Sequence, residues 1–172
     1  MASTYQIFER AERIELVAAA IYQALAERFA ADPEARAFLQ RLQAEELQHA
    51  SRVRLLAARY RHDPRLLDRL VPGVRELESL EAECEAVLAA ARAGQWGRDL
   101  EDVYRLLGAL EDRFARAHAD LIAREGNAEL RAFFVQLAAQ DQAHARIAGG
   151  RAAGAAPEPD ADLDPRDGGR ER

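Results

Sequence analysis

The stretch EARAFLQRLQAEELQHA, residues 34–50, occurs a second time as ELRAFFVQLAAQDQAHA, residues 129–145. Eight of the seventeen aligned positions are identical at an offset of 95 (129 − 34), and both copies end in His-Ala. Glu46 lies opposite Asp141, so each copy carries an acid three residues before its histidine. Residues i and i+3 share one face of a helix, where they can bind one metal ion together. The duplication predicts a pseudo-symmetric helical bundle with two metal ions in its middle.

The composition of the 172-residue chain is typical of one all-helical domain. Hydrophobic residues make up 49% of it and charged residues 31%, with little Gly or Pro before residue 149. A net charge of −6 argues against a broad nucleic-acid-binding surface. Cys84 is the single cysteine, which excludes an intrachain disulfide or a cysteine-rich metal centre. Because we find no signal peptide and no apolar run of membrane-spanning length, we predict a cytoplasmic protein without membrane or nucleic-acid partners.

Hydrophobic residues recur at steps of three and four along most of the chain, which predicts amphipathic helices. The predicted helices span about residues 5–30, 33–62, 74–93, 99–124 and 128–148. Asp32-Pro33 and Gly126-Asn127 supply tight turns, so the first two long helices are antiparallel neighbours, and so are the last two. The predicted fold is all-α: an antiparallel four-helix bundle with a long crossover, which contains the extra helix 74–93.

Proline and glycine mark the other predicted boundaries. Pro64 is expected to end the second helix, Pro72-Gly73 to form a turn, and Gly149-Gly150 to end the last helix. Residues 151–172 are rich in Pro, Gly and Asp, a composition that cannot bury enough apolar surface to order itself. We therefore predict a helical domain over residues 1–150 and a disordered polar tail over 151–172.

Ionisable residues interrupt the apolar stripe of each long helix. A buried unpaired carboxylate costs roughly several kcal/mol, so four of them facing one another need cations. Two divalent ions would neutralise four carboxylates, and two neutral imidazoles would complete their coordination. Oxygen and nitrogen ligands suit iron or manganese, and zinc is possible. The candidate metal ligands are Glu15, Glu46, His49, Glu111, Asp141 and His144.

Two of these positions have rivals on the same stripe. Glu45 lies as close to the stripe centre as Glu46. Glu46 is favoured because its counterpart in the second copy, Asp141, is an acid, whereas the counterpart of Glu45 is not. Glu12 competes with Glu15. Glu15 is favoured because Glu111, on the third long helix, follows it after 96 residues, an offset close to the 95 residues of the repeat. His118 lies farther along that third helix and is interpreted as a hydrogen-bonded core histidine that can approach the site.

Together these motifs resemble the ferritin-like superfamily, most closely its rubrerythrin-type branch. The resemblance covers residues 5–148 and rests on Glu15-x6-Tyr22, Glu45-Glu46-x2-His49-Ala50, the Glu111 helix and Asp141-x2-His144. It implies a di-iron carboxylate centre that reacts with O2 or H2O2, with the six candidate residues as ligands. It also implies that Glu46 and Asp141 bridge the ions, and that Tyr22 lies beside them as a hydrogen-bond donor.

The chain departs from the family pattern in three ways. Asp141 stands where rubrerythrin-type proteins have glutamate, so its carboxylate reaches one methylene less far. The chain lacks the cysteine-ligated iron module of many members, so electrons would come from an external donor. Gly108 and Phe114 occupy the positions near which peroxidase-type members carry a further glutamate. The resemblance also implies a homodimer formed through the first two helices.

The main hypothesis is a di-iron oxidoreductase that reacts with O2 or H2O2 and has a peroxide-removing or oxidative-stress role. The alternatives are a ferritin-type ferroxidase that handles iron, a bundle hydroxylase acting on a small molecule, and a metal-free helical interaction protein. Metal content separates the last alternative from the others.

Overall fold

A computed structural model describes residues 4–60, 74–124 and 128–154, and this part of the chain contains five helices and no strand. The helices are α1 (Thr4–Arg28), α2 (Pro33–Tyr60), α3 (Val74–Arg92), α4 (Leu100–Arg124) and α5 (Ala128–Ala152). The all-helical prediction is confirmed, and the predicted ends agree within two residues except at the end of α5. The predicted breaks at Pro64, Pro72-Gly73 and Gly126-Asn127 lie outside the described residues.

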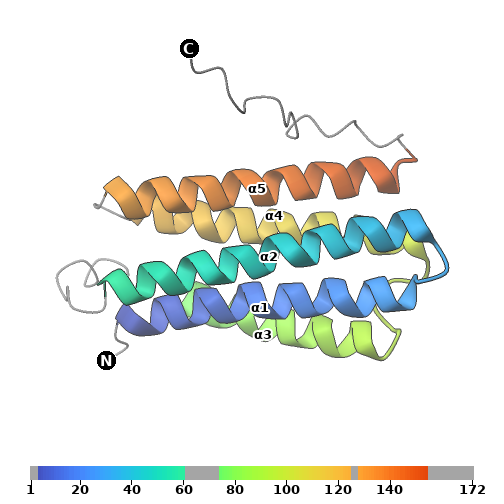
Figure 1. Ribbon diagram of the computed structural model, residues 1–172, viewed down its shortest axis with the longest axis horizontal. Helices are drawn as coiled ribbons and strands as arrows, with labels where there is room; N and C mark the ends of the chain where they lie inside the picture. The colour runs from blue at the N-terminus through green and yellow to red at the C-terminus, as the bar shows by residue number, and fades with distance from the viewer. Residues whose placement is uncertain (1–3, 61–73, 125–127, 155–172) are drawn as a thin grey trace, which may run out of the picture.

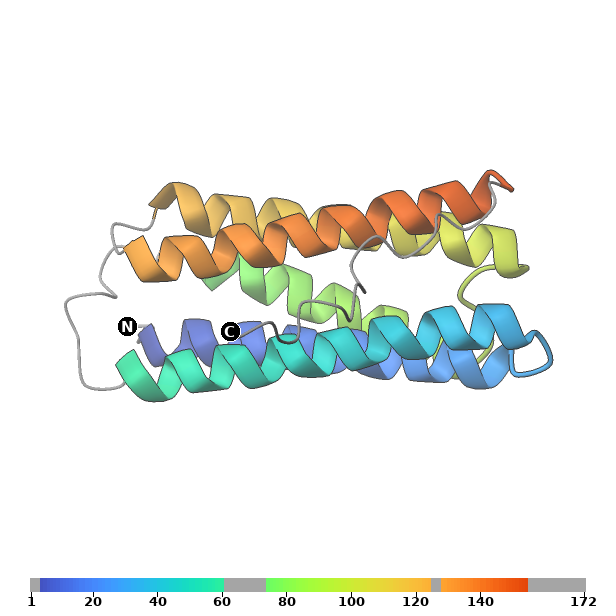
Figure 2. The same ribbon diagram turned by 45° about the horizontal axis from the view of Figure 1, so that its top comes forward.

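Two antiparallel pairs, α1/α2 and α4/α5, lie side by side in a bundle (Figure 1). Within each pair the helices pack closely along their length. The remaining helix, α3, lies behind the two pairs, where it packs mainly on α1 and touches α4 (Figure 2). The four long helices therefore surround one interior, and the repeated acid–histidine motifs lie on α2 and α5, one in each pair.

The sequence sets the turn between α1 and α2 through an N-cap. The Asp32 side chain accepts hydrogen bonds from the backbone N–H groups of Glu34 and Ala35 at 3.0 and 2.9 Å. Pro33 begins the helix at a position whose N–H would have no helical partner. Asp99 caps α4 in the same way, because its carboxylate accepts the N–H of Asp102 at 2.9 Å.

The predicted end of the last helix at Gly149-Gly150 is wrong, because α5 continues to Ala152. A helical glycine costs about 1 kcal/mol relative to alanine, which packing can offset. Here Arg151 supplies that packing: its guanidinium lies over the Phe38 ring at 4.5 Å and donates to Glu34 at 2.8 Å. Gly154, with φ of 72°, follows the helix instead. The rest of the predicted tail, 155–172, lies outside the described residues.

Ion pairs hold α3 against the bundle. Arg10 on α1 contacts Glu78 and Glu81 at 2.9 and 2.5 Å, and Arg113 on α4 contacts Glu83 at 2.5 Å. The acidic face of α3 is therefore partly paired with the bundle. Cys84 of the same helix is fully buried.

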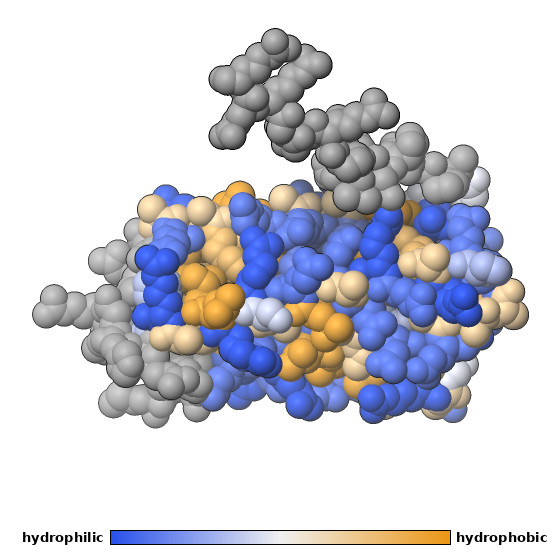
Figure 3. All heavy atoms as spheres, in the orientation of Figure 1, coloured by the Kyte–Doolittle hydropathy of each residue, from blue (hydrophilic) through white to orange (hydrophobic). Residues whose placement is uncertain are grey.

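The face of the molecule seen in Figure 3 is mainly hydrophilic, with separate apolar spots. Among the described residues, the exposed large hydrophobic side chains are Leu16, Leu47, Leu55 and Val135. No helix in the described ranges combines the length and the hydropathy that crossing a membrane requires.

Candidate metal centre

The interior of the bundle holds a cluster of ionisable side chains. In the described ranges seven polar or charged residues are buried, and all seven gather between the two helix pairs. They include all six candidate ligands and one further histidine: Glu15, Glu46, His49, Glu111, His118, Asp141 and His144. Everything else buried in those ranges is hydrophobic. Such a concentration of charge in an otherwise apolar core needs a chemical explanation.

A first group of possible metal ligands forms around His49. Its Nδ1 atom is 3.0 Å from a carboxylate oxygen of Glu46, three residues earlier on α2, and 3.6 Å from one of Glu15 on α1. All three side chains are buried, and their ligand atoms lie within 4.8 Å of one another. This helix pair therefore brings two carboxylates and one imidazole nitrogen to a single point.

A second group forms around His144 and uses Glu46 again. His144 Nδ1 is 3.4 Å from Glu46 Oε1 and 3.5 Å from Glu111 Oε2. The imidazole rings of His144 and His49 lie nearly parallel, at 19°, with centroids 6.4 Å apart. Glu46 thus belongs to both groups, each of which adds one glutamate and one histidine of its own. The two groups could therefore each hold a metal ion, with Glu46 as an acid common to both.

Asp141 is the one candidate ligand that joins neither group. Its Oδ2 atom instead contacts Nδ1 of His118 at 2.7 Å, while His118 Nε2 lies 3.6 Å from Glu15. The prediction of a hydrogen-bonded core histidine at 118 is confirmed, and its partner is a predicted ligand. The aspartate side chain is one methylene shorter than that of glutamate, which is consistent with its absence from both groups.

Tyr22 lies beside the second group, as the resemblance implies. It is fully buried, and its hydroxyl donates to Glu111 Oε1. This bond leaves the other oxygen, Oε2, facing His144. His118 occupies the repeated position 96 residues after Tyr22 (118 − 22), and it likewise reaches across the bundle to the acid of the opposite pair. His118 and Tyr22 therefore occupy equivalent positions in the two helix pairs.

The rival acids lie outside both groups. The side chain of Glu45 is 33% exposed and contacts His144 Nε2 at 2.5 Å. Glu12 pairs with Arg54 across α1 and α2 at 2.5 Å. Sequence reasoning missed Gln140, the repeat counterpart of Glu45, whose side-chain oxygen is 3.0 Å from His49 Nε2.

The charges of the cluster strongly shift its pKa values. Burial disfavours the charged imidazoles, but contacts with carboxylates outweigh it and raise the pKa of His49 to about 10 and that of His144 to about 12. Burial raises the pKa of Glu111 to about 7 and that of Glu15 well above its usual value. Burial opposes the ionisation of Glu46 too, but its contacts with the imidazoles of His144 and His49 hold its pKa well below normal.

Unsatisfied polar atoms also converge on this centre. Five buried side-chain atoms in it have no hydrogen-bond partner: Glu15 Oε1, Glu46 Oε1, Glu111 Oε2, Asp141 Oδ1 and His144 Nδ1. Two ligand atoms at about 2.1 Å from a common ion are separated by about 3.0–3.4 Å, close to the spacings seen here. The residues present therefore fit divalent cations. Their carboxylate oxygens and imidazole nitrogens suit iron or manganese, and zinc is compatible.

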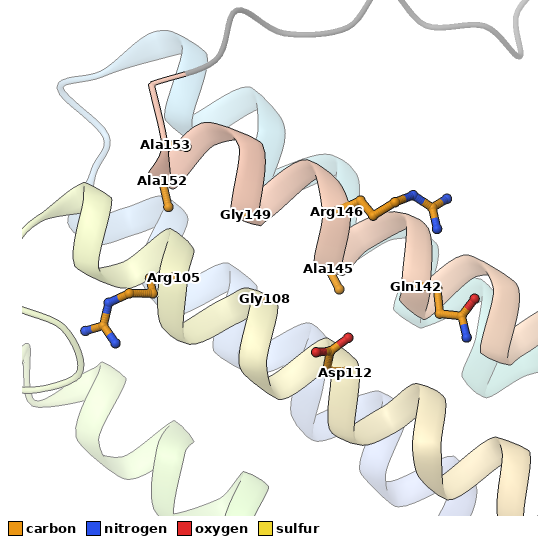
Figure 4. A pocket seen from close by; sticks show the side chains of 9 residues that line it. All are labelled: Arg105, Gly108, Asp112, Gln142, Ala145, Arg146, Gly149, Ala152 and Ala153. Atoms are coloured by element: carbon orange, nitrogen blue, oxygen red, sulfur yellow. The ribbon is translucent and has the colours of Figure 1, made fainter.

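A separate groove runs along the outer side of α4 and α5 (Figure 4). Small residues form its floor, and polar side chains such as Arg105 and Asp112 border it. Gly108 permits this close helix packing, since a Cβ there would lie 3.3 Å from the Ala145 carbonyl oxygen. None of the residues that line the groove belongs to the buried cluster.

Comparisons with known proteins leave the centre to be interpreted from its own residues. No protein-family model, curated protein or solved structure matches this chain. What the geometry itself establishes is a buried group of carboxylates and histidines able to hold metal ions.

Proposed function

We propose that the protein is a di-iron oxidoreductase that reduces O2 or H2O2 at the buried centre, with a fold and ligand set of the ferritin-like, rubrerythrin type. One observation carries the proposal: Glu46 is shared between two groups, and each group adds one glutamate and one histidine. In the proposal, Glu15 with His49 and Glu111 with His144 are the terminal ligands of the two ions. Glu46 would be the acid that both ions share.

Two ferrous ions bound there would supply two electrons to the oxidant. The surrounding residues prepare the site for this reaction. Tyr22 donates to Glu111 and thereby directs its second oxygen toward His144. Asp141 contacts His118 at 2.7 Å and joins neither group of candidate ligands. The proposal therefore assigns the shared position to Glu46 alone. The apolar core around the cluster excludes bulk water from the charged groups.

Reduction of one H2O2 to two waters consumes two electrons and two protons. Cys84, the single cysteine, is buried on α3, so this chain has no cysteine-ligated iron module to store further electrons. Each turnover therefore draws its electrons from an external donor.

The decisive experiment loads the anaerobically purified protein with Fe2+ and then adds O2 or H2O2. We expect two iron ions per chain and a ferric absorption band that disappears on reduction. His49→Ala and His144→Ala should each lose iron and reactivity, whereas Glu27→Gln, on an exposed turn of α1, should retain both. A protein that is fully loaded and inert toward both oxidants would reject the proposal.

A metal-free structural role is the second candidate, and one observation favours it. Three buried histidines, His49, His118 and His144, contact the four buried acids, and the raised pKa values of His49 and His144 let these two balance part of the negative charge. The cluster would then only stabilise the bundle, as an ion-pair network. Metal analysis distinguishes the two functions, because a self-neutralised cluster gains nothing from cations and would be purified without them.

A further inference from the structure

The two histidines of the centre are each held by the repeat motif of the opposite helix pair. His144 on α5 contacts Glu45 on α2 through Nε2, at 2.5 Å. His49 on α2 contacts Gln140 on α5 through Nε2, at 3.0 Å. Glu45 and Gln140 are counterparts at the offset of 95 (140 − 45), so the exchange is reciprocal. In both histidines the opposite nitrogen, Nδ1, faces the carboxylates of the centre.

These contacts fix which nitrogen is available for a metal. An ionised carboxylate can only accept a hydrogen bond, so Glu45 requires a proton on Nε2 of His144. The side-chain oxygen of Gln140, 3.0 Å away, can accept the Nε2–H of His49 in the same way. Each ring therefore keeps its Nε2–H and offers Nδ1 to the centre, and His144 Nδ1 is a buried atom without a hydrogen bond.

At this pair of positions the two histidines have chemically different partners. The partner of His144 is an anion, whereas the partner of His49 is a neutral amide. Arg41, 3.9 Å from the other oxygen of Glu45, helps to orient that carboxylate toward the ring. A carboxylate that accepts a hydrogen bond from one ring nitrogen makes the other nitrogen a stronger donor to a metal. The negative charge of the carboxylate also attracts the cation.

We propose that Glu45 and Gln140 make the two metal sites unequal, so that the His144 site binds a divalent cation first and more tightly than the His49 site. Both are positioning residues that act through the histidines. The inference rests on the proposed metal centre and adds an order of loading to it. It assigns Glu45, the rival acid of the sequence repeat, a specific role next to the ligands.

The test is a titration of the full-length, metal-free protein with Zn2+, which undergoes no redox chemistry. The wild type should bind two ions in two resolved steps. His144→Ala should remove the tighter step, and His49→Ala the weaker one. Glu45→Gln should weaken the tighter step by about 10- to 100-fold and leave the weaker one in place. Gln140→Glu should strengthen the weaker step by about tenfold or more, bringing the two constants together.

Matched variants control for the change in total charge. Glu27→Gln removes one negative charge on an exposed turn of α1, and Gln95→Glu adds one in the exposed turn after α3. Neither should change the two steps. The inference is overturned if the wild type binds two ions with equal affinity, or if Glu45→Gln and Gln140→Glu leave both steps unchanged.

These outcomes are separate from those of the proposed function. Equal steps in a protein whose ferrous form reacts with O2 or H2O2 would reject the unequal sites and keep the oxidoreductase. Unequal steps that respond to Glu45→Gln, in a protein inert to both oxidants, would do the reverse.

Discussion

Metal uptake by this centre should expel protons, and the number follows from the structure. The pKa of His49 is raised to about 10 and that of His144 to about 12, so at pH 7 both carry an extra proton. Each imidazole must lose it before Nδ1 can bind an ion. The pKa of Glu111 is about 7, so this acid is half protonated at pH 7 and contributes a further half proton. The raised pKa of Glu15 adds to this number, so loading both sites at pH 7 should release at least about 2.5 protons per chain.

Calorimetric titration with Zn2+ in several buffers of different ionisation enthalpy measures this number directly. His49→Ala and His144→Ala should each lower the release by about one proton. Since protons compete with the metal, the affinity of each site should rise about tenfold per pH unit between pH 7 and pH 9. Uptake of two ions with fewer than about half a proton released would refute this reasoning, because it would mean that neutral imidazoles already line the centre.

Three further results are expected. The pKa of His49 is about 10 in the folded protein and about 6.5 in the unfolded chain. The charged imidazole therefore stabilises the metal-free protein fully below pH 6.5, and this stabilisation is lost as the pH rises through 10. The Tm of the metal-free protein should fall from pH 7 to pH 10, and an unchanged Tm would contradict this. Tyr22→Phe removes the hydrogen-bond donor to Glu111 and should lower the free energy of unfolding, measured by chemical denaturation, by about 1.5–3 kcal/mol. A change near zero would contradict this expectation. Gly149→Ala should add about 0.5–1 kcal/mol to the free energy of unfolding, because the residue is helical and its Cβ would meet no atom within 4 Å; destabilisation would place the helix end before it.

Much of the fold could be predicted from the sequence because its signals are local. Periodic apolar residues and the Asp32-Pro33 cap define α1 and α2 almost to the residue. The end of α5 could not be predicted in this way. Gly149-Gly150 is a local stop signal, whereas Arg151 is held by Phe38 and Glu34, more than a hundred residues earlier in the chain. Contacts between distant segments leave no trace in a short window of sequence.

The candidate site was predictable to the extent that the repeat describes it. The duplication places Glu46, His49 and His144 at inward positions, and all three lie in the cluster. The ligand set predicted from the sequence contains only His49 and His144 as histidines, so cations were expected to neutralise the four buried carboxylates. His118 adds a third imidazole and takes Asp141 as its partner. That pairing depends on which side chains meet between α4 and α5, which spacing along one helix does not specify.

The most direct measurement is anomalous diffraction at the iron absorption edge, from crystals of the full-length protein grown anaerobically with Fe2+. We expect two peaks inside the bundle, both in contact with Glu46, one beside His49 and the other beside His144. Peaks found only at surface acids, with the interior carboxylates paired to the three histidines alone, would contradict it.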